Sequence, residues 1–319
     1  MMKVLLLVQK EQRVILDRLY EGIAAHVDCD LRWLSDEEQA DLRRYFRDKV
    51  ELSRYTHIVF FLRFKKEIRQ VSFIRTVPNL VILEHDAWQN YFPCKYQGKF
   101  SAHYRNLPAA RVLCSGFQVA ERLKAEGTDA VFVPKGYDQT LLRNLGNPRD
   151  IELGFVGSTK SGIYSERKAM LEDIARREPL QIVRTRSGDE YLQMLNRIRF
   201  FVSADIGMGE YMIKNFEAMA CGCVLLAYDQ GEAENRALGF EDMHNLVLYR
   251  NVDELQAKLA MLRTQPDLAS RIAAAGQALV ERDYAFSRIG ERCVEALQAP
   301  LRVAPALGFW ARLRLRLGV

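Results

Sequence analysis

A glycine-containing stretch in the second half of the sequence combines a lysine and a glutamate in a pattern suited to binding a diphosphate and a ribose. Residues 207–227 read GMGEYMIKNFEAMACGCVLLA, which predicts a loop, a helix of small residues ending at Gly222, and a buried strand. Glycines let a backbone approach a ligand closely, and the N–H groups of a helix start, with Lys214 beside them, favour phosphate. Glu217 lies one turn further, where its carboxylate can accept hydrogen bonds from both ribose hydroxyls. By residue types alone, a surface loop with a solvated glutamate fits equally well.

A second group of ionisable residues, Glu84-His85-Asp86, directly follows the apolar run Leu80–Leu83. The carboxyl ends of strands in an open α/β sheet border the ligand-binding crevice. Three adjacent ionisable side chains do not fit a core, so His85 and Asp86 are candidates for proton transfer. A capped strand end is the alternative interpretation.

Positive side chains are the third requirement, because a leaving diphosphate must have its charge neutralised. The candidates are Lys160, Arg167 and Lys214. For Lys160 a solvated loop lysine is the alternative, and Arg184 and Arg186 either flank a nucleobase or are solvated. No metal-binding Asp-x-Asp is recognised, and we predict a site that needs neither metal nor cofactor.

The segment Phe216–Gly222 with its following apolar strand resembles the hallmark of the GT-B glycosyltransferases, in particular the family-4 enzymes (glycosyl transferases group 1) and the spore-coat, CgeB-like group. The resemblance covers about Arg111 to Leu297. Its further matches, in chain order, are Val112–Ser115 with Leu123–Gly127, Val133–Asp138, Phe155–Ser158 with Tyr164 and Arg167, and Gly276 to Ser287.

The resemblance implies roles for individual residues. Glu217 would bind the donor ribose, and the loop before it the diphosphate and sugar. The expected donor-binding residues are Gly157, Lys160, Arg167, Gly209, Tyr211, Lys214, Asn215 and Glu217. On the first-domain side, His85 would donate a hydrogen bond to the sugar or phosphate, and Asp86 would act as general base if the reaction inverts.

One departure from the family-4 pattern concerns the acid that contacts the donor sugar. The family places it eight positions before the ribose glutamate, where this chain has Gly209. Glu210 is the neighbouring residue, one position out of register, and we keep it as the third catalytic candidate beside His85 and Asp86. A simple retaining mechanism is therefore not implied.

The elements that must position these residues form two similar halves. Short apolar runs alternate with helical patterns, which predicts parallel sheets. The expected strands are 4–8, 57–62, 80–83, 111–114 and 130–133, then 152–156, 180–184, 200–203, 224–227 and 246–249; the expected helices of the second half are 165–177, 190–197, 215–220, 252–263, 268–282 and 286–297.

The predicted fold class is α/β, with two Rossmann-like domains facing a cleft (GT-B) and a C-terminal helix crossing back to the first domain. Residues 1–142 form the acceptor-side domain, and residues 150–285 the nucleotide-sugar-binding domain. The crossover helix is 286–298, the basic amphipathic tail is 299–319, and the polar segment 143–150 is the expected linker.

Composition limits the classes of protein. Of 319 residues, 49% are hydrophobic and 27% charged, as in a globular protein, and the net charge of +5 is too small for a nucleic-acid binder. Six cysteines without a Cys-x-x-Cys spacing indicate reduced thiols, and neither a signal peptide nor a membrane span is recognised, so we expect a cytoplasmic protein.

The C-terminal residues of the sequence predict contact with a membrane. Residues 308–319 carry an apolar stripe and a basic stripe, which suits peripheral binding to the inner, anionic face of the cytoplasmic membrane. A disordered tail, or one packed on the first domain, is the alternative.

These features together predict a glycosyltransferase that moves a sugar from a nucleotide-sugar to a glycan or lipid-linked acceptor in bacterial surface polysaccharide biosynthesis (lipopolysaccharide, O-antigen or exopolysaccharide). Two alternatives remain open. One is a GT-B nucleotide-sugar epimerase or hydrolase, and the other is a catalytically silent partner that binds a sugar nucleotide. An NAD-dependent enzyme is disfavoured, because no Gly-x-Gly-x-x-Gly follows the first strand of either half.

Overall fold

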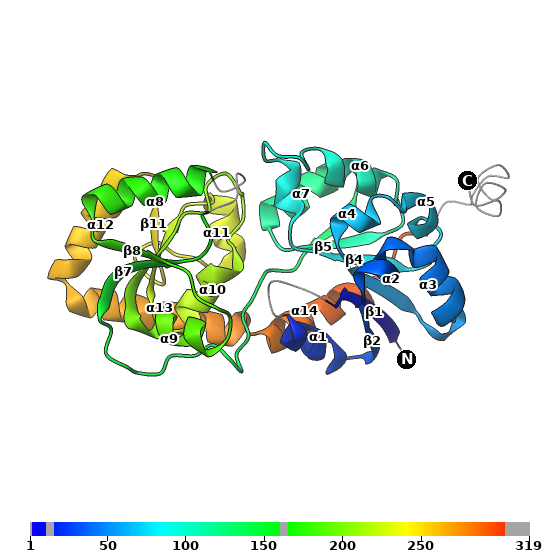
Figure 1. Ribbon diagram of the computed structural model, residues 1–319, viewed down its shortest axis with the longest axis horizontal. Coiled ribbons are helices and arrows are strands. Elements are labelled where there is room, and N and C mark those ends of the chain that lie inside the picture. The colour runs from blue at the N-terminus through cyan, green and yellow to red at the C-terminus, as the bar shows by residue number, and fades with distance from the viewer. Residues whose placement is uncertain (1, 11–15, 160–164, 304–319) are drawn as a thin grey trace. The chain divides into compact units, whose positions relative to one another are not determined.

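The computed structural model describes residues 2–10, 16–159 and 165–303. The chain divides into two compact units (Figure 1). The first comprises residues 1–115, 119–133 and 290–319, and the second comprises residues 116–118 and 134–289. Each unit is a parallel sheet with helices on both faces, so the predicted pair of Rossmann-like domains is confirmed.

The first unit is built on six parallel strands in the order β2-β1-β3-β4-β5-β6. Figure 1 shows α1 and α14 on one side of this sheet and α6 and α7 on the other. The strands are β1 (Lys3–Gln9), β2 (Asp28–Leu34), β3 (His57–Phe61), β4 (Leu80–Glu84), β5 (Arg111–Cys114) and β6 (Asp129–Phe132). The α-helices are α1 (Asp17–Ala24), α2 (Asp36–Ala40), α3 (Leu42–Lys49), α4 (Phe64–Glu67), α5 (Val71–Ile74), α6 (Lys99–Arg105) and α7 (Phe117–Ala125).

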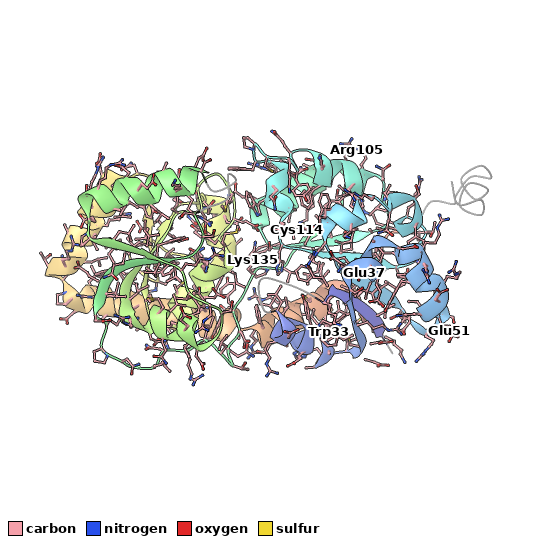
Figure 2. All side chains as sticks on the ribbon, in the orientation of Figure 1. Trp33, Glu37, Glu51, Arg105, Cys114 and Lys135 are labelled. Atoms are coloured by element: carbon pink, nitrogen blue, oxygen red, sulfur yellow. The ribbon has the colours of Figure 1, made fainter. Side chains whose placement is uncertain are left out.

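The buried centre of this sheet explains why its strands are recognisable in the sequence. All five residues from Val4 to Val8 are fully buried, as expected for a parallel strand covered on both faces. Strand β2 was not predicted, because its sequence DCDLRWL alternates charged and apolar residues. It lies at the edge of the sheet, where Asp30 pairs with Arg32 and Trp33 is 45% exposed (Figure 2).

The second unit is built on five parallel strands in the order β11-β10-β9-β7-β8. Figure 1 shows α8 and α12 on one face of this sheet and α9, α10 and α13 on the other. The strands are β7 (Ile151–Val156), β8 (Leu180–Val183), β9 (Ile198–Ser203), β10 (Val224–Tyr228) and β11 (Val247–Tyr249). The helices are α8 (Ser165–Arg177), α9 (Asp189–Arg197), α10 (Ile213–Ala220), α11 (Glu232–Leu238), α12 (Val252–Thr264) and α13 (Pro266–Asp283). Helix α14 (Phe286–Gln298) begins in this unit and ends in the first.

The boundaries between the units differ from the expected ones. The polar segment 143–150 belongs to the second unit, where the Arg149 guanidinium donates to the backbone oxygens of Leu195, Ile198 and Cys221. Its polarity therefore reflects hydrogen bonding inside that unit, and it is not a linker. The chain instead passes to the second unit between Val133 and Pro134, and it returns to the first unit within α14, between Ile289 and Gly290.

Candidate functional site

Glu217 lies on α10, the helix that follows the glycine loop. The Tyr191 hydroxyl, from α9, donates a hydrogen bond to Glu217 Oε2 at 2.6 Å. Burial raises the pKa of Glu217, whereas the Lys214 ammonium and the Tyr191 hydrogen bond lower it. Glycine is required at the end of this helix, because Gly222 has a φ of 75°. Tyr191 was not predicted from the sequence.

Lys214 and Gly157 lie next to this pair. The Lys214 Nζ is 4.7 Å from the centroid of the Tyr191 ring. A Cβ at position 157 would lie 2.9 Å from Phe155 Cζ and 3.2 Å from Lys214 Cε, so glycine leaves the space that the lysine side chain uses. Burial lowers the pKa of the Lys214 ammonium. The structure thus brings together three of the predicted donor-binding residues, Gly157, Lys214 and Glu217.

Asp205 organises the segment between β9 and α10. It is 3% exposed, and its carboxylate accepts hydrogen bonds from Arg167 Nη2 at 2.5 Å, Asn215 Nδ2 at 2.8 Å and the Met212 backbone N–H at 3.1 Å. Two predicted donor-binding residues, Arg167 and Asn215, are therefore held by one buried carboxylate. Sequence reasoning missed Asp205, although an acid directly after an apolar strand is the signal that identified Glu84-His85-Asp86.

The glycine loop itself adopts left-handed backbone conformations, with φ of 71° at Gly207 and 67° at Gly209. The next residue, Glu210, is 1% exposed and pairs at 2.8 Å with Lys135 of the Pro134-Lys-Gly turn. Lys135 is labelled in Figure 2. Tyr211 is 2% exposed, and its hydroxyl donates to Asn235 Oδ1. Glu210 and Tyr211 thus form contacts inside the second unit, while their predicted roles toward a ligand stay predictions. Lys135 was not predicted.

The ionisable residues of the first unit lie at the end of β4, as expected. Glu84 accepts hydrogen bonds at both oxygens, from the Asp86 backbone N–H at 2.6 Å and from the Tyr104 hydroxyl at 3.0 Å. Burial raises the pKa of Glu84 to about 8, and the Asp86 carboxylate adds to this rise. His85 packs against the Phe61 ring at 5.1 Å, and Asp86 is exposed. The proton-transfer roles of His85 and Asp86 remain predictions.

The remaining predictions concern metal binding, membrane spans and residues outside the described ranges. Lys160 and the tail 308–319 lie outside the described residues. In the described ranges, no cluster of three or more His, Cys, Asp or Glu residues could hold a metal ion. An Asp-x-Asp triplet does occur at Asp28-Cys29-Asp30, but Asp30 is bound to Arg32 and Tyr55. No helix among the described residues could cross a membrane.

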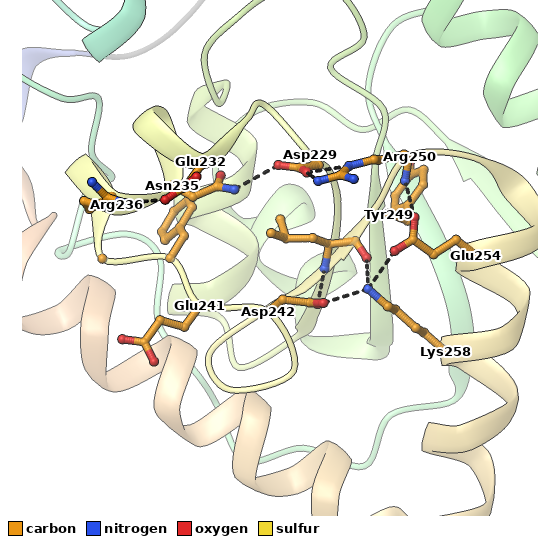
Figure 3. Close-up of a pocket in the computed structure, with 13 residues that line it drawn as sticks. Asp229, Glu232, Asn235, Arg236, Glu241, Asp242, Tyr249, Arg250, Glu254 and Lys258 are labelled. Atoms are coloured by element: carbon orange, nitrogen blue, oxygen red, sulfur yellow. Dashed lines mark hydrogen bonds and ion pairs between the residues drawn. The ribbon is translucent and has the colours of Figure 1, made fainter.

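A cavity of about 590 Å³ lies elsewhere in the second unit, beyond the ends of β10 and β11 (Figure 3). Several of its charged groups pair with one another, such as Asp229 with Arg250 at 2.8 Å and Lys258 with Asp242 at 2.7 Å. None of the predicted site residues lines it. Because five acidic and only three basic side chains line it, it is a poorer candidate for an anionic ligand than the Glu217 region.

Comparisons with known proteins agree with this arrangement. Residues 139–295 match a family model described as glycosyl transferase-like. Among curated protein sequences, none matches the chain significantly. Three similar solved structures are Anabaena HepE in complex with UDP-glucose (TM-score 0.68, 15% identity, covering 94% of this chain and 100% of that one), the Thermosynechococcus elongatus sucrose-phosphate synthase (0.65, 12%, 93% and 98%), and T4 phage BGT with UDP and Mn²⁺ (0.60, 12%, 93% and 99%).

At these identities the solved structures establish the fold, and the family match adds the activity class for the second half of the chain. Together they show that the chain has the GT-B fold and that its residues 139–295 form a glycosyl transferase-like domain.

Proposed function

We propose that this glycosyltransferase moves a sugar from a nucleotide-sugar donor to a glycan or lipid-linked acceptor in the assembly of bacterial surface polysaccharide. The observation that carries the donor part is the group formed by Glu217, Lys214 and Gly157. A carboxylate that can accept from ribose hydroxyls lies beside an ammonium group that can bind phosphate, and a glycine leaves room for the lysine side chain.

The donor site also has the rigidity that binding requires. Asp205 fixes Arg167 and the first turn of α10 through three hydrogen bonds, so the polar groups are ordered before a ligand arrives. Preorganisation of this kind lowers the entropy that binding must overcome. We take UDP-sugars as the first donors to test, because HepE and T4 phage BGT were solved with UDP or UDP-glucose.

Acceptor activation is assigned to the first unit. His85 and Asp86 follow β4, where ligands bind in open α/β sheets, and Asp86 is exposed and therefore accessible to an acceptor hydroxyl. Metal independence is part of the proposal, with Lys214 and Arg167 in place of a divalent cation. Adding EDTA should then leave turnover unchanged, and a loss of activity that Mn²⁺ restores would refute this part.

The experiment that tests the donor site combines a ligand panel with one substitution. UDP-, GDP-, ADP- and dTDP-glucose and a CMP-sugar are compared by thermal shift, since a ligand that binds the native state stabilises it. For the best ligand, Glu217→Ala should weaken binding by about 2 kcal/mol or more in calorimetry, because hydrogen bonds to charged groups contribute about 1.5–3 kcal/mol each. Equal affinity of the two proteins would remove the claim.

A second candidate function is favoured by the surroundings of Glu210. Gly209 occupies the position of the family's sugar-contacting acid, and the neighbouring Glu210 is buried against Lys135. This favours a GT-B protein that binds the donor without transferring it. Donor hydrolysis or epimerisation without an acceptor, or binding without any turnover, would support this candidate over transfer.

The proposal includes a cytoplasmic location with peripheral membrane binding through residues 308–319. It rests on the sequence of that segment, which joins three arginines with an apolar stripe of Phe309, Trp310, Leu313 and Leu317. Flotation with anionic vesicles should distinguish the full chain from one lacking 308–319, and salt should weaken the binding. Equal flotation of both proteins would exclude the membrane role and leave the transferase.

A further inference from the structure

Tyr191 occupies a position between the two charged groups of the proposed donor site. It is 8% exposed and comes from α9, whereas Glu217 and Lys214 come from α10. Its hydroxyl contacts Glu217 Oε2 at 2.6 Å, and its ring faces Lys214 Nζ at 4.7 Å from the centroid. One side chain therefore touches both the carboxylate and the ammonium group.

The two oxygens of Glu217 have different surroundings. Oε2 accepts from Tyr191, whereas the described part of the chain provides no hydrogen bond to Oε1. A glutamate side chain loses conformational entropy when it is fixed in one rotamer. Because the Tyr191 hydrogen bond already fixes Glu217 in the free protein, ligand binding does not include that entropy loss. The bond to Oε2 thus orients Oε1 before a ligand is present.

We propose that Tyr191 is a positioning residue of the nucleotide-sugar site, whose hydroxyl fixes one oxygen of Glu217 and whose ring supports Lys214, so that the other carboxylate oxygen and the ammonium group are presented together. The inference rests on the proposed function and extends it to a residue of another helix. A cation over an aromatic face is attracted by the ring's electron density, which holds the lysine near the carboxylate.

Electrostatics supports this assignment. The Tyr191 hydrogen bond and the Lys214 charge both lower the pKa of Glu217, against the effect of burial. Burial and the Glu217 carboxylate keep the pKa of Tyr191 well above 10, so its hydroxyl stays a donor throughout the accessible pH range. The tyrosine therefore favours the ionised carboxylate, which is the form that accepts hydrogen bonds from two hydroxyls.

The test is Tyr191→Phe, which keeps the buried ring and removes the O–H group. In the free protein, the ¹³C-carboxyl signal of Glu217, assigned by its loss in Glu217→Gln, should titrate at a higher pH in Y191F than in the parent protein. Binding of UDP-glucose at pH 7 should weaken about five-fold, the usual size of one hydrogen bond. At pH values above the titration of Glu217 in Y191F the loss should be smaller, because both proteins then hold the ionised carboxylate.

A matched control is available in the first unit. Tyr104→Phe removes the same kind of bond from Glu84, and it should change neither the Glu217 titration nor UDP-glucose binding. If Y191F leaves the Glu217 midpoint and the affinity unchanged while Glu217→Ala weakens binding, the inference is overturned and the proposed function stands. If Glu217→Ala has no effect either, both are overturned. Thermal unfolding of Y191F checks that the fold is retained.

Discussion

Each unit of this molecule holds a buried glutamate oxygen that accepts a hydrogen bond from a tyrosine, and the two pairs differ in what surrounds them. Beside Glu84 lie the carboxylates of Asp86 and Glu67, which raise its pKa further, and both of its oxygens are engaged. Beside Glu217 lies the Lys214 ammonium, and the described residues engage one of its oxygens.

Two other carboxylates of the second unit also lie beside cations, as Glu217 does and Glu84 does not. Glu210 pairs with Lys135 and Asp205 with Arg167, so each acid near the glycine loop has a cation within reach. A neighbouring cation favours the charged form of a carboxyl group, whereas neighbouring carboxylates disfavour it. Glu84 therefore acts as a neutral structural group, whereas the Glu217 region is arranged to bind a charged ligand.

The largest effect is expected from breaking a cation–carboxylate pair of the second unit. Lys135→Met removes the cation beside a buried carboxylate, and the free energy of unfolding should fall by about 3–5 kcal/mol. Adding Glu210→Gln removes the charge as well and should restore most of the loss. Hydrogen exchange in peptides from 134–289 measures this, and a double variant as unstable as Lys135→Met would contradict the explanation.

An intermediate effect is expected in the first unit, as a dependence of stability on pH. The pKa of Glu84 is about 8 in the native state, above its ordinary 4.5. The stability that the protonated Glu84 carboxyl contributes is therefore present in full below about pH 4.5 and is lost as the pH rises through about 8. Between pH 5 and 9 the parent protein should lose on the order of 3 kcal/mol more than Glu84→Gln does.

Tryptophan fluorescence suits this measurement, because no tryptophan occurs between residues 134 and 289, and Trp33 and Trp88 report the first unit. Tyr191→Phe provides the comparison, since it alters the corresponding pair of the second unit. Equal pH profiles for the parent protein and Glu84→Gln would show that Glu84 is ionised in the native state and would remove the contrast between the two glutamates.

The smallest effect compares two glycines of the second unit. Gly157→Ala places a Cβ against Phe155 and the Lys214 side chain, so it should cost about 1–3 kcal/mol and weaken UDP-glucose binding. Gly209→Ala has no atom within 4 Å of the new Cβ and carries only the backbone strain of its φ of 67°, about 1 kcal/mol. If the two variants bind the donor equally, Lys214 does not need the space at Gly157.

Much of the fold could be predicted from local patterns. The helix 165–177 and the strand at Val4–Val8 were found because a helical repeat and a continuous apolar run are strong signals. Strand β2 was not predicted because its charged residues, which are typical of an edge strand, interrupt the apolar run. Helix α11 was not predicted because it is short and its acidic residues obscure the repeat of apolar positions.

The residues of the candidate site also fall into two groups, those that a local sequence pattern predicts and those that it does not. Glu217 and Lys214 could be placed from one motif, because the glycine loop and helix start are contiguous in sequence, and Gly157 could be placed from a second one, Phe155–Ser158. Tyr191 and Lys135 could not, since each reaches the site from another element and no local pattern marks a residue whose partner is distant in the chain. Packing, and not periodicity, decides such contacts.

The charged edge strand β2 has a consequence for the behaviour of the protein in concentrated solution. An exposed strand edge is a template on which another chain can add a strand, the first step toward aggregation. Here an incoming strand would have to lie beside Asp28, Asp30 and Arg32 and remove water from them without supplying partners. The same alternation that hid β2 from a hydrophobicity pattern thus makes that edge of the first sheet resistant to edge-to-edge association.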